Sequence, residues 1–116
     1  MATTENSSET DHSDRGSLFL VVGPSGVGKN TMIRRAIEQD SRMRYIPSLC
    51  TREMRVSESQ GKPYCFITKD EFLSQIEENK LLEWEEVNGF YYGSSIHDIE
   101  ACLSEGLDAI TDMDVF

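Results

Sequence analysis

Residues 18–31 read LFLVVGPSGVGKNT, and this stretch decides the fold. Residues 18–22 are all apolar, which is typical of a strand buried on both faces of a parallel sheet. A glycine-rich loop follows, and residues 29–39 then place apolar side chains at helical spacing. Strand, loop and helix in direct succession predict an α/β fold with a parallel sheet.

The glycine-rich loop has the pattern G-x-x-x-x-G-K-x-T. Its glycines let backbone N–H groups point inward, and the following helix N-terminus adds partial positive charge, so such a loop binds phosphate oxygens. Lys29 would reach the β- and γ-phosphates of ATP. The alternative is a glycine turn without a ligand, but the strand and helix around the loop favour the phosphate site. The predicted ATP phosphate-binding residues are Gly23, Pro24, Ser25, Gly26, Val27, Gly28, Lys29, Asn30 and Thr31.

Asn30 departs from the usual pattern, which has Ser or Thr directly after the lysine to bind Mg²⁺ through its hydroxyl. An amide oxygen can still approach a metal ion, although Asn is larger and a different ligand. We therefore expect Mg²⁺, bound together with ATP, as the cofactor, and Asn30 as its candidate protein ligand.

Composition narrows the classes of partner. The chain has 116 residues and a net charge of -10, which argues against a nucleic-acid or anionic-membrane surface but not against a small phosphorylated ligand. No apolar run approaches membrane-spanning length. The three cysteines match no metal motif and predict free thiols in a reducing cytoplasm. Residues 1–16 are polar, lack the apolar part of a secretory signal, and predict a disordered acidic tail.

The middle of the chain predicts a second, β-rich region. Thr68 and Glu71 form a capping box that begins a helix, and Asn88-Gly89 predicts a two-residue hairpin turn. Ser95 caps a further helix that Gly106 ends. Strands are predicted at 45–50, 64–67, 81–87, 90–92 and 107–113. The whole is an α/β parallel core with an inserted β-rich subdomain.

The chain from about residue 18 to its end resembles the guanylate kinase family of P-loop nucleoside monophosphate kinases, in the N-terminal part of the domain. The resemblance rests on GPSGVGK, Thr51-Arg52-x-x-Arg55, Glu58-x-x-Gly61-Lys62-x-Tyr64-x-Phe66, Leu82-Glu83-Trp84, Tyr91-Tyr92-Gly93-Ser94 and Asp112-x-Asp114. It implies a guanylate kinase-like domain over 17–116, with a P-loop core at 17–43 and 94–116 and a GMP-binding subdomain at 44–93. Family members continue with a lid and further core strands, so we expect little kinase activity from this chain alone.

The resemblance also implies roles for individual residues in phosphoryl transfer from ATP to GMP, giving ADP and GDP. Guanidinium groups bind phosphate bidentately, and a carboxylate can accept from both N1–H and the 2-amino group of guanine, so Glu83 would read the base. The implied GMP-binding residues are Ser48, Arg52, Arg55, Tyr64, Glu83, Tyr92, Ser94 and Asp114. The implied catalytic residues are Lys29, Arg52 and Asp112.

Other interpretations remain open. Arg52 and Arg55 could be solvated surface charges, and Glu83 could belong to an acidic face. The chain could also be a guanylate-kinase-like module that binds proteins, or a P-loop kinase for another phosphorylated acceptor. Cys50 stands where the family usually has Thr, which softens the match in the loop that carries Arg52 and Arg55.

Overall fold

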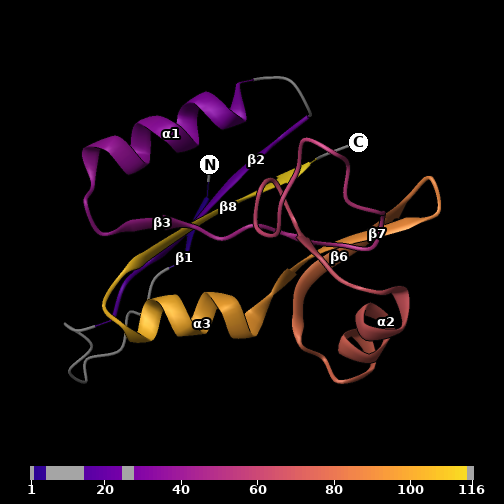
Figure 1. Cartoon of the computed structure of the whole chain (residues 1–116). Helices are drawn as coiled ribbons and strands as arrows, with labels where there is room; N and C mark the ends of the chain where they lie inside the picture. Colours follow the sequence, from indigo (N-terminus) through magenta and orange to yellow (C-terminus); the bar gives the residue numbers. More distant parts are fainter. Residues whose placement is uncertain (1, 5–14, 25–27, 115–116) are drawn as a thin grey trace. The chain divides into compact units, whose positions relative to one another are not determined.

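The computed structural model describes residues 2–4, 15–24 and 28–114. Along the chain run β1 (Ala2–Thr4), β2 (Leu18–Gly23), α1 (Lys29–Gln39), β3 (Met43–Tyr45), β4 (Leu49–Cys50), β5 (Cys65–Phe66), α2 (Lys69–Glu77), β6 (Leu81–Val87), β7 (Phe90–Ser95), α3 (Ile96–Ser104) and β8 (Asp108–Asp114), as Figure 1 shows. They divide into two compact units, one of residues up to Ile46 and from Asp98 onward, the other Pro47–His97. The divisions lie a few residues beyond the predicted boundaries at 43/44 and 93/94.

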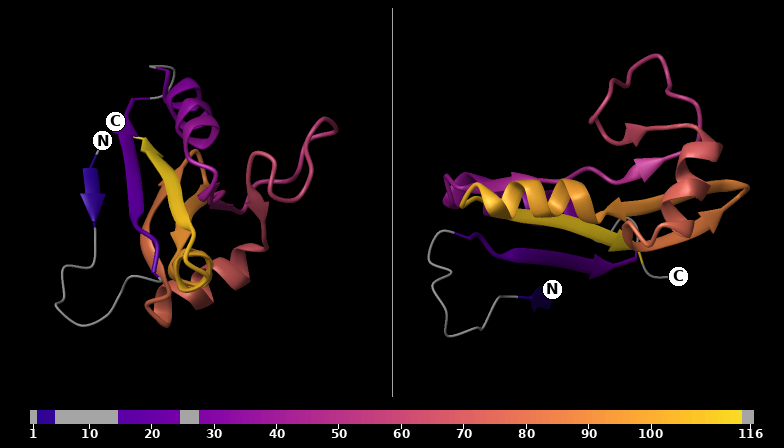
Figure 2. Two further views of the ribbon diagram at one scale, coloured as in Figure 1. Left: turned by 90° about the vertical axis from the view of Figure 1, so that its left-hand side faces the viewer. Right: turned by 90° about the horizontal axis from the view of Figure 1, so that it is seen from below.

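The first unit is built on a sheet of strand order β1-β2-β8-β3. The strands β2, β8 and β3 run parallel, whereas β1 pairs with β2 in the antiparallel direction. Figure 2 shows β2 and β8 side by side, and their register pairs Leu18 with Ala109 and Gly23 with Asp114. The carboxyl ends of two parallel strands therefore meet where the glycine-rich loop begins.

Helices cover both faces of this sheet, α1 on one and α3 on the other (Figure 1). The cluster on the α3 side is formed by Leu18, Ile99, Cys102, Leu103 and Ala109. The cluster on the α1 side is formed by Val21, Ile33, Met43 and Ile110. Neighbouring residues of β8 thus enter different clusters, which explains why the strands read as continuous apolar runs.

The second unit contains a sheet of strand order β5-β4-β7-β6 and the helix α2. Asn88 and Gly89 join β6 to β7 with φ angles of 53° and 85°, the positive values that a two-residue hairpin turn requires. Thr68 and Glu71 form the predicted capping box at the start of α2. Phe72 of α2 is fully buried and stacks on Tyr91, so the helix covers one face of the sheet.

The prediction of one strand at 45–50 is wrong. The chain forms β3 in the first unit and β4 in the second, which are separate strands in separate sheets. Ile46 still donates its N–H to the Ile110 carbonyl at 2.9 Å, but Pro47 has no N–H with which to continue the ladder. The proline marks the boundary between the two units.

The predicted disordered tail, residues 1–16, is wrong in two places. Ala2–Thr4 forms β1, because backbone pairing with the edge of β2 needs no apolar burial and threonine favours extended backbone. Arg15 pairs with Glu100 at 2.9 Å, and the Gly16 N–H donates to the Leu103 carbonyl at 3.1 Å. The rest of the predicted tail, residues 1 and 5–14, lies outside the described residues.

Candidate functional site

The glycine-rich loop is described at its two ends. Gly23 and Pro24 leave β2, and Gly28 precedes the first residue of α1 with φ 87°, a left-handed conformation that glycine adopts without strain. Ser25, Gly26 and Val27 lie outside the described residues. The glycine at position 28 therefore has a backbone reason that is independent of any ligand.

Lys29 is buried, with 7% of its surface exposed. Its Nζ donates to the carbonyl of Gly23 at 2.9 Å and lies 3.4 Å from the carbonyl of Met113. Gly23 is the last residue of β2 and Met113 the last but one of β8, so the ammonium lies at the carboxyl ends of parallel strands. In open α/β sheets, ligands bind at that edge.

Asp112 and Asp114 lie on β8, near the same edge. The Oδ1 atom of Asp112 accepts a hydrogen bond of 3.0 Å from the Tyr45 hydroxyl of β3. Asp114 pairs in register with Gly23. The structure therefore places both carboxylate-bearing residues on the strand that adjoins the start of the loop.

The residues near this edge fit a magnesium–nucleotide better than a metal held by protein alone. Asn30 and Thr31 are exposed in the first turn of α1. Within 2–4, 15–24 and 28–114, no group of three His, Cys, Asp or Glu residues could hold a metal ion. Mg²⁺ usually keeps several waters and binds one or two protein oxygens together with substrate phosphates. The Asn30 amide and the Asp112 carboxylate are oxygen ligands of the required kind.

In the second unit, one face of the sheet carries three of the predicted GMP-binding residues, Glu83, Tyr92 and Ser94. Successive residues of a strand alternate between faces, so Tyr92 and Ser94 of β7 share a face. In the register of the sheet, Tyr92 lies opposite Cys50 of β4, and Ser94 lies opposite Glu83 of β6. We call this surface, with Glu83, Tyr92 and Ser94, the polar face. The helix α2 packs against the opposite face.

The opposite face, under α2, carries the alternate residues of the same strands. Tyr91 stacks on Phe72 and lies 5.9 Å from Trp84 between ring centroids. A Cβ atom on Gly93 would meet the Glu83 carbonyl at 2.8 Å and the Phe72 ring at 3.0 Å. The strands and α2 approach closely here, and only glycine fits at position 93.

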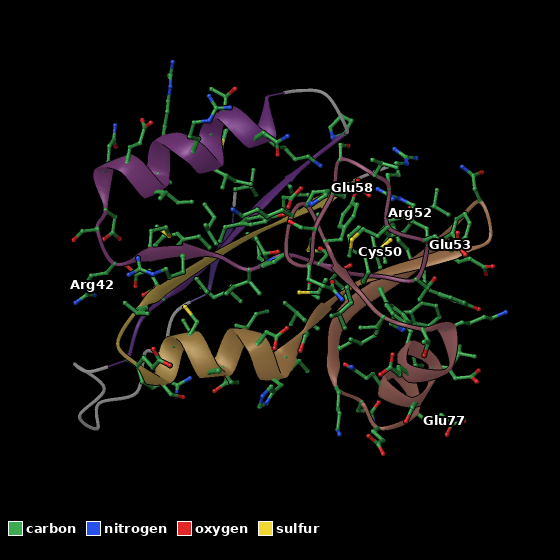
Figure 3. All side chains as sticks on the ribbon, viewed as in Figure 1. Arg42, Cys50, Arg52, Glu53, Glu58 and Glu77 are labelled. Atoms are coloured by element: carbon green, nitrogen blue, oxygen red, sulfur yellow. The ribbon has the colours of Figure 1, made fainter. Side chains whose placement is uncertain are left out.

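Arg52 and Glu58 form a bidentate ion pair beside the polar face (Figure 3). Both bonds are 2.8 Å long, and each side chain is only 11% exposed. The Arg52 guanidinium also lies over the rings of Tyr64 and Phe66, 5.4 Å from each centroid. The Arg52 hydrogen bonds, together with that from the Arg55 backbone, lower the pKa of Glu58 to about 2, so the carboxylate is ionised at neutral pH.

Tyr64 and Tyr92 meet edge to face, with ring centroids 5.5 Å apart. Burial, with the neighbouring Cys50, raises the pKa of the Tyr92 hydroxyl above its ordinary value. The phenol is therefore neutral at physiological pH and can act as a hydrogen-bond donor. Arg52, Tyr64 and Tyr92 together form a cluster of one cation and two phenols.

Glu83 and Ser94 form a second pair on the polar face. Ser94 is buried, with 1% exposed, and its hydroxyl donates to Glu83 Oε1 at 2.5 Å. Ser48 is half-buried next to β4, and its backbone carbonyl accepts from the Cys65 N–H at 2.9 Å. The carboxylate predicted to read guanine is thus held in orientation by a neighbouring hydroxyl.

The predicted residues therefore fall into two groups, one in each unit. Lys29, Asp112 and Asp114 belong to the first unit with the loop, whereas the predicted residues from Ser48 to Ser94 belong to the second. Arg55 is exposed, and its backbone N–H donates to Glu58 Oε1 at 2.8 Å.

Sequence reasoning quoted Glu58 as part of the family pattern but gave it no role, and it missed Tyr45 as a partner of Asp112. The sequence contained a signal for the role of Glu58, because this acid lies close to two arginines. It contained no signal for the contact of Tyr45 with β8, since that contact depends on the sheet register.

No helix in the described part of the chain is long and apolar enough to cross a membrane.

The comparisons with known proteins agree with the predicted resemblance. A family model described as guanylate kinase matches residues 15–116. The guanylate kinase of Bacillus subtilis is 43% identical over 104 residues, covering 88% of this chain and 50% of the relative. That of Geobacter metallireducens is 40% identical over 100 residues, covering 86% and 49%.

Solved structures give the same result. The crystal structure of guanylate kinase from Anaplasma phagocytophilum matches with a TM-score of 0.63 and 25% identity, covering 86% of this chain and 50% of that one. The chain spans about half the length of the curated relatives it matches. The predicted α/β fold class with a parallel sheet is confirmed. With a family model matched over residues 15–116, this chain belongs to the guanylate kinase family.

Proposed function

We propose that the chain serves the guanylate kinase reaction, in which a phosphoryl group passes from ATP to GMP and gives ADP and GDP. The observation that carries the proposal is the polar face of the second unit. It combines a cation with two phenols, suited to a phosphate, and a hydroxyl-held carboxylate, suited to guanine. A nucleoside monophosphate with a guanine base offers both partners in one molecule.

On the acceptor side, Arg52 and Arg55 would bind the GMP phosphate, with Tyr64 and Tyr92 adding neutral donors. Glu83 would accept from N1–H and the 2-amino group of guanine, with Ser48, Ser94 and Asp114 as further contacts. Adenine has no such donor pair, so AMP would leave the carboxylate unpaired and bind poorly.

On the donor side, the backbone of residues 23–28 would hold the ATP phosphates. Lys29 would neutralise charge on the β- and γ-phosphates from the position where the strand carbonyls hold it. Asn30 would hold Mg²⁺ with the nucleotide, and Asp112 would lie near that region. When bound, the ion supplies further neutralisation of the phosphate oxygens.

The chemistry itself would be positioning and charge stabilisation. A phosphate oxygen of GMP attacks the γ-phosphorus of ATP in line, and the bond to the ADP oxygen breaks. No side chain needs to remove a proton, because a phosphate monoester is largely ionised near pH 7. Arg52 and Lys29 would stabilise negative charge on the acceptor and on the transferred group, respectively.

Binding is the primary test, because the chain covers about half of its relatives' length. Calorimetry should detect ATP with Mg²⁺ and GMP separately, with AMP at least about tenfold weaker than GMP. A coupled ADP-formation assay then measures turnover by the chain, which we expect to be low. Equal affinity for AMP and GMP, or no GMP binding at millimolar concentration, would contradict the proposal.

Glu83→Gln sharpens that test, because the amide keeps the size of the side chain and replaces an acceptor with a donor. GMP affinity should fall at least about tenfold while ATP affinity stays unchanged. Glu86→Gln, an equal change of charge at an exposed position of the same strand, is the matched control. The alternatives of a protein-binding module or a kinase for another acceptor predict no selective effect of Glu83→Gln on GMP.

A further inference from the structure

Glu58 links the two arginines that the proposed function assigns to the GMP phosphate. Its Oε1 accepts from Arg52 Nη1 and from the backbone N–H of Arg55, and its Oε2 accepts from Arg52 Nη2, each at 2.8 Å. One carboxylate therefore holds the side chain of the first arginine and the backbone of the second. It lies in the loop between β4 and β5, shielded from solvent to the same extent as Arg52.

The pattern of bonds determines which edge of the Arg52 guanidinium remains for a ligand. Guanidinium carries five N–H donors. Glu58 takes one hydrogen from each terminal nitrogen, and the Glu53 carbonyl accepts from Nη1 at 3.1 Å. These contacts use both hydrogens of Nη1 and one of Nη2. The remaining hydrogens, on Nε and Nη2, form the neighbouring fork. The guanidinium also interacts with the Tyr92 hydroxyl, so this fork and the phenol could bind two phosphate oxygens together.

Aromatic rings restrict the guanidinium as well. Its Cζ lies 5.4 Å from the ring centroids of both Tyr64 and Phe66, and those two rings are nearly perpendicular, at 87°. A cation that contacts two aromatic rings and is held at one edge by a carboxylate has little freedom to rotate. The second fork is therefore presented in one direction before any ligand arrives, which lowers the ordering cost of binding.

We propose that Glu58 is a positioning residue for the nucleotide phosphate: it holds Arg52 by one fork so that the Nε–Nη2 edge is oriented to bind a phosphate monoester, and it fixes the turn that carries Arg55. This inference rests on the proposed function, since the ligand in question is the phosphate of the acceptor nucleotide. In the opposite arrangement, phosphate would have to displace Glu58 from Arg52. Removing the Glu58 charge would then strengthen GMP binding instead of weakening it.

The test uses Glu58→Gln, which removes the charge and keeps the size, with GMP and guanosine as the two probes. The GMP dissociation constant should rise about tenfold or more, because the charge-assisted contact between Glu58 and Arg52 is lost. That contact orients the residue that would bind the phosphate and not the residues that would bind the base. The constants for guanosine and for ATP should stay within about twofold. Glu53→Gln is the matched control in the same loop, because Glu53 contacts Arg52 through its backbone carbonyl. It should change none of the three dissociation constants.

A double-mutant cycle separates positioning from a general effect on the loop. The amide oxygen of Glu58→Gln can still accept the Arg55 N–H, so this variant tests the contact with Arg52. Adding Glu58→Gln to Arg52→Ala should therefore weaken GMP binding by less than about twofold further. Fully additive losses would overturn the proposal. So would tighter GMP binding by Glu58→Gln, the result that competition predicts, or an equal loss for GMP and guanosine, the result that a collapsed loop predicts.

Failure of the proposed function would give a different result. If the unaltered chain bound neither GMP nor guanosine, the guanylate kinase proposal would fail, and inorganic phosphate would then be the probe for Glu58. Weaker phosphate binding by Glu58→Gln, with Glu53→Gln unchanged, would still support the positioning role. Equal phosphate binding by both variants would exclude it.

Discussion

Ser94 shows how a single buried hydroxyl can control a charged neighbour. Its side chain is buried on β7, and its one hydroxyl hydrogen is donated to Glu83 of β6. Without that bond the carboxylate loses the contact that orients it. Base recognition should therefore depend on Ser94 almost as strongly as on Glu83 itself.

Ser94→Ala should weaken GMP and guanosine equally, by about threefold to tenfold, because the lost hydrogen bond supports the base contact and not the phosphate contact. Calorimetry with both ligands measures this ratio. Ser74→Ala, at an exposed position of α2, is the control and should change neither affinity. A loss confined to GMP would show that Ser94 acts on the phosphate instead.

The ion pair of Glu58 has a consequence for acid stability. Its pKa falls from 4.5 to about 2 on folding, because Arg52 and the Arg55 backbone stabilise the ionised form. The unfolded chain then binds the proton more readily than the folded chain over that interval. The stabilisation is complete above pH 4.5 and is lost as the pH falls toward 2.

Urea unfolding at a series of pH values should therefore show a loss of stability between pH 4.5 and 2 that is larger in the unaltered chain than in Glu58→Gln. The difference between the two proteins is the relevant quantity, because Glu71 also has a lowered pKa. Parallel curves for the two proteins over this range would show that the pair does not contribute.

At the level of single residues, the sequence predicted the types of chemistry better than the contacts. Glu83, Arg52 and the tyrosines could be named from the family pattern, because their roles follow from donor and acceptor chemistry. The bond from Tyr45 to Asp112 could not, since it joins β3 to β8 across 67 positions of sequence. Such contacts depend on strand register, which local sequence does not encode.

Among the elements, β7 is the one on which both faces of the second sheet depend. Its Tyr92 and Ser94 face the proposed ligand, whereas Tyr91 and Gly93 face α2. The absence of a side chain at Gly93 lets the Glu83 carbonyl and the Phe72 ring approach. A change on the α2 side is therefore transmitted to the strand that carries Glu83.

Gly93→Ala should lower the free energy of unfolding by about 1–3 kcal/mol, because a carbonyl at 2.8 Å and a buried ring at 3.0 Å cannot both retreat. It should also weaken GMP binding, since Glu83 must shift. Gly89→Ala, in the hairpin turn, is the comparison: a Cβ there meets nothing within 4 Å, but φ is 85°. It should lower stability and leave GMP affinity unchanged, as denaturant titration and calorimetry can check.

Element prediction succeeded where a local signal was strong. The helix predicted at 29–39 begins and ends as expected, and Asn88-Gly89 forms the expected turn. It failed at residues 45–50, where apolar residues on both sides of Pro47 resembled one strand. The choice between one strand and two depends on which sheet each part joins, which is a tertiary property.

Over the whole molecule, the first unit is made of two separate segments of the sequence, with the second unit inserted between them. The first unit takes its strands from both ends of the sequence, since β2 pairs with β8 from Leu18↔Ala109 onward. The second unit is one continuous segment, Pro47–His97. The alternation of elements along the sequence predicted an inserted β-rich region, but the exact points of division came from the packing.

This interruption sets an order of assembly. During synthesis on the ribosome, all of the inserted segment is translated before β8, so β2 lacks its parallel neighbour until that segment has been made. Joining β2 to β8 also requires closure of a long loop, which is entropically unfavourable until that segment has become compact. Trp84 is the sole tryptophan and lies in the early segment. Its fluorescence in refolding experiments should therefore reach the native value before protection of the β2 amides from hydrogen exchange does, and the opposite sequence of events would show that the parallel sheet organises the chain.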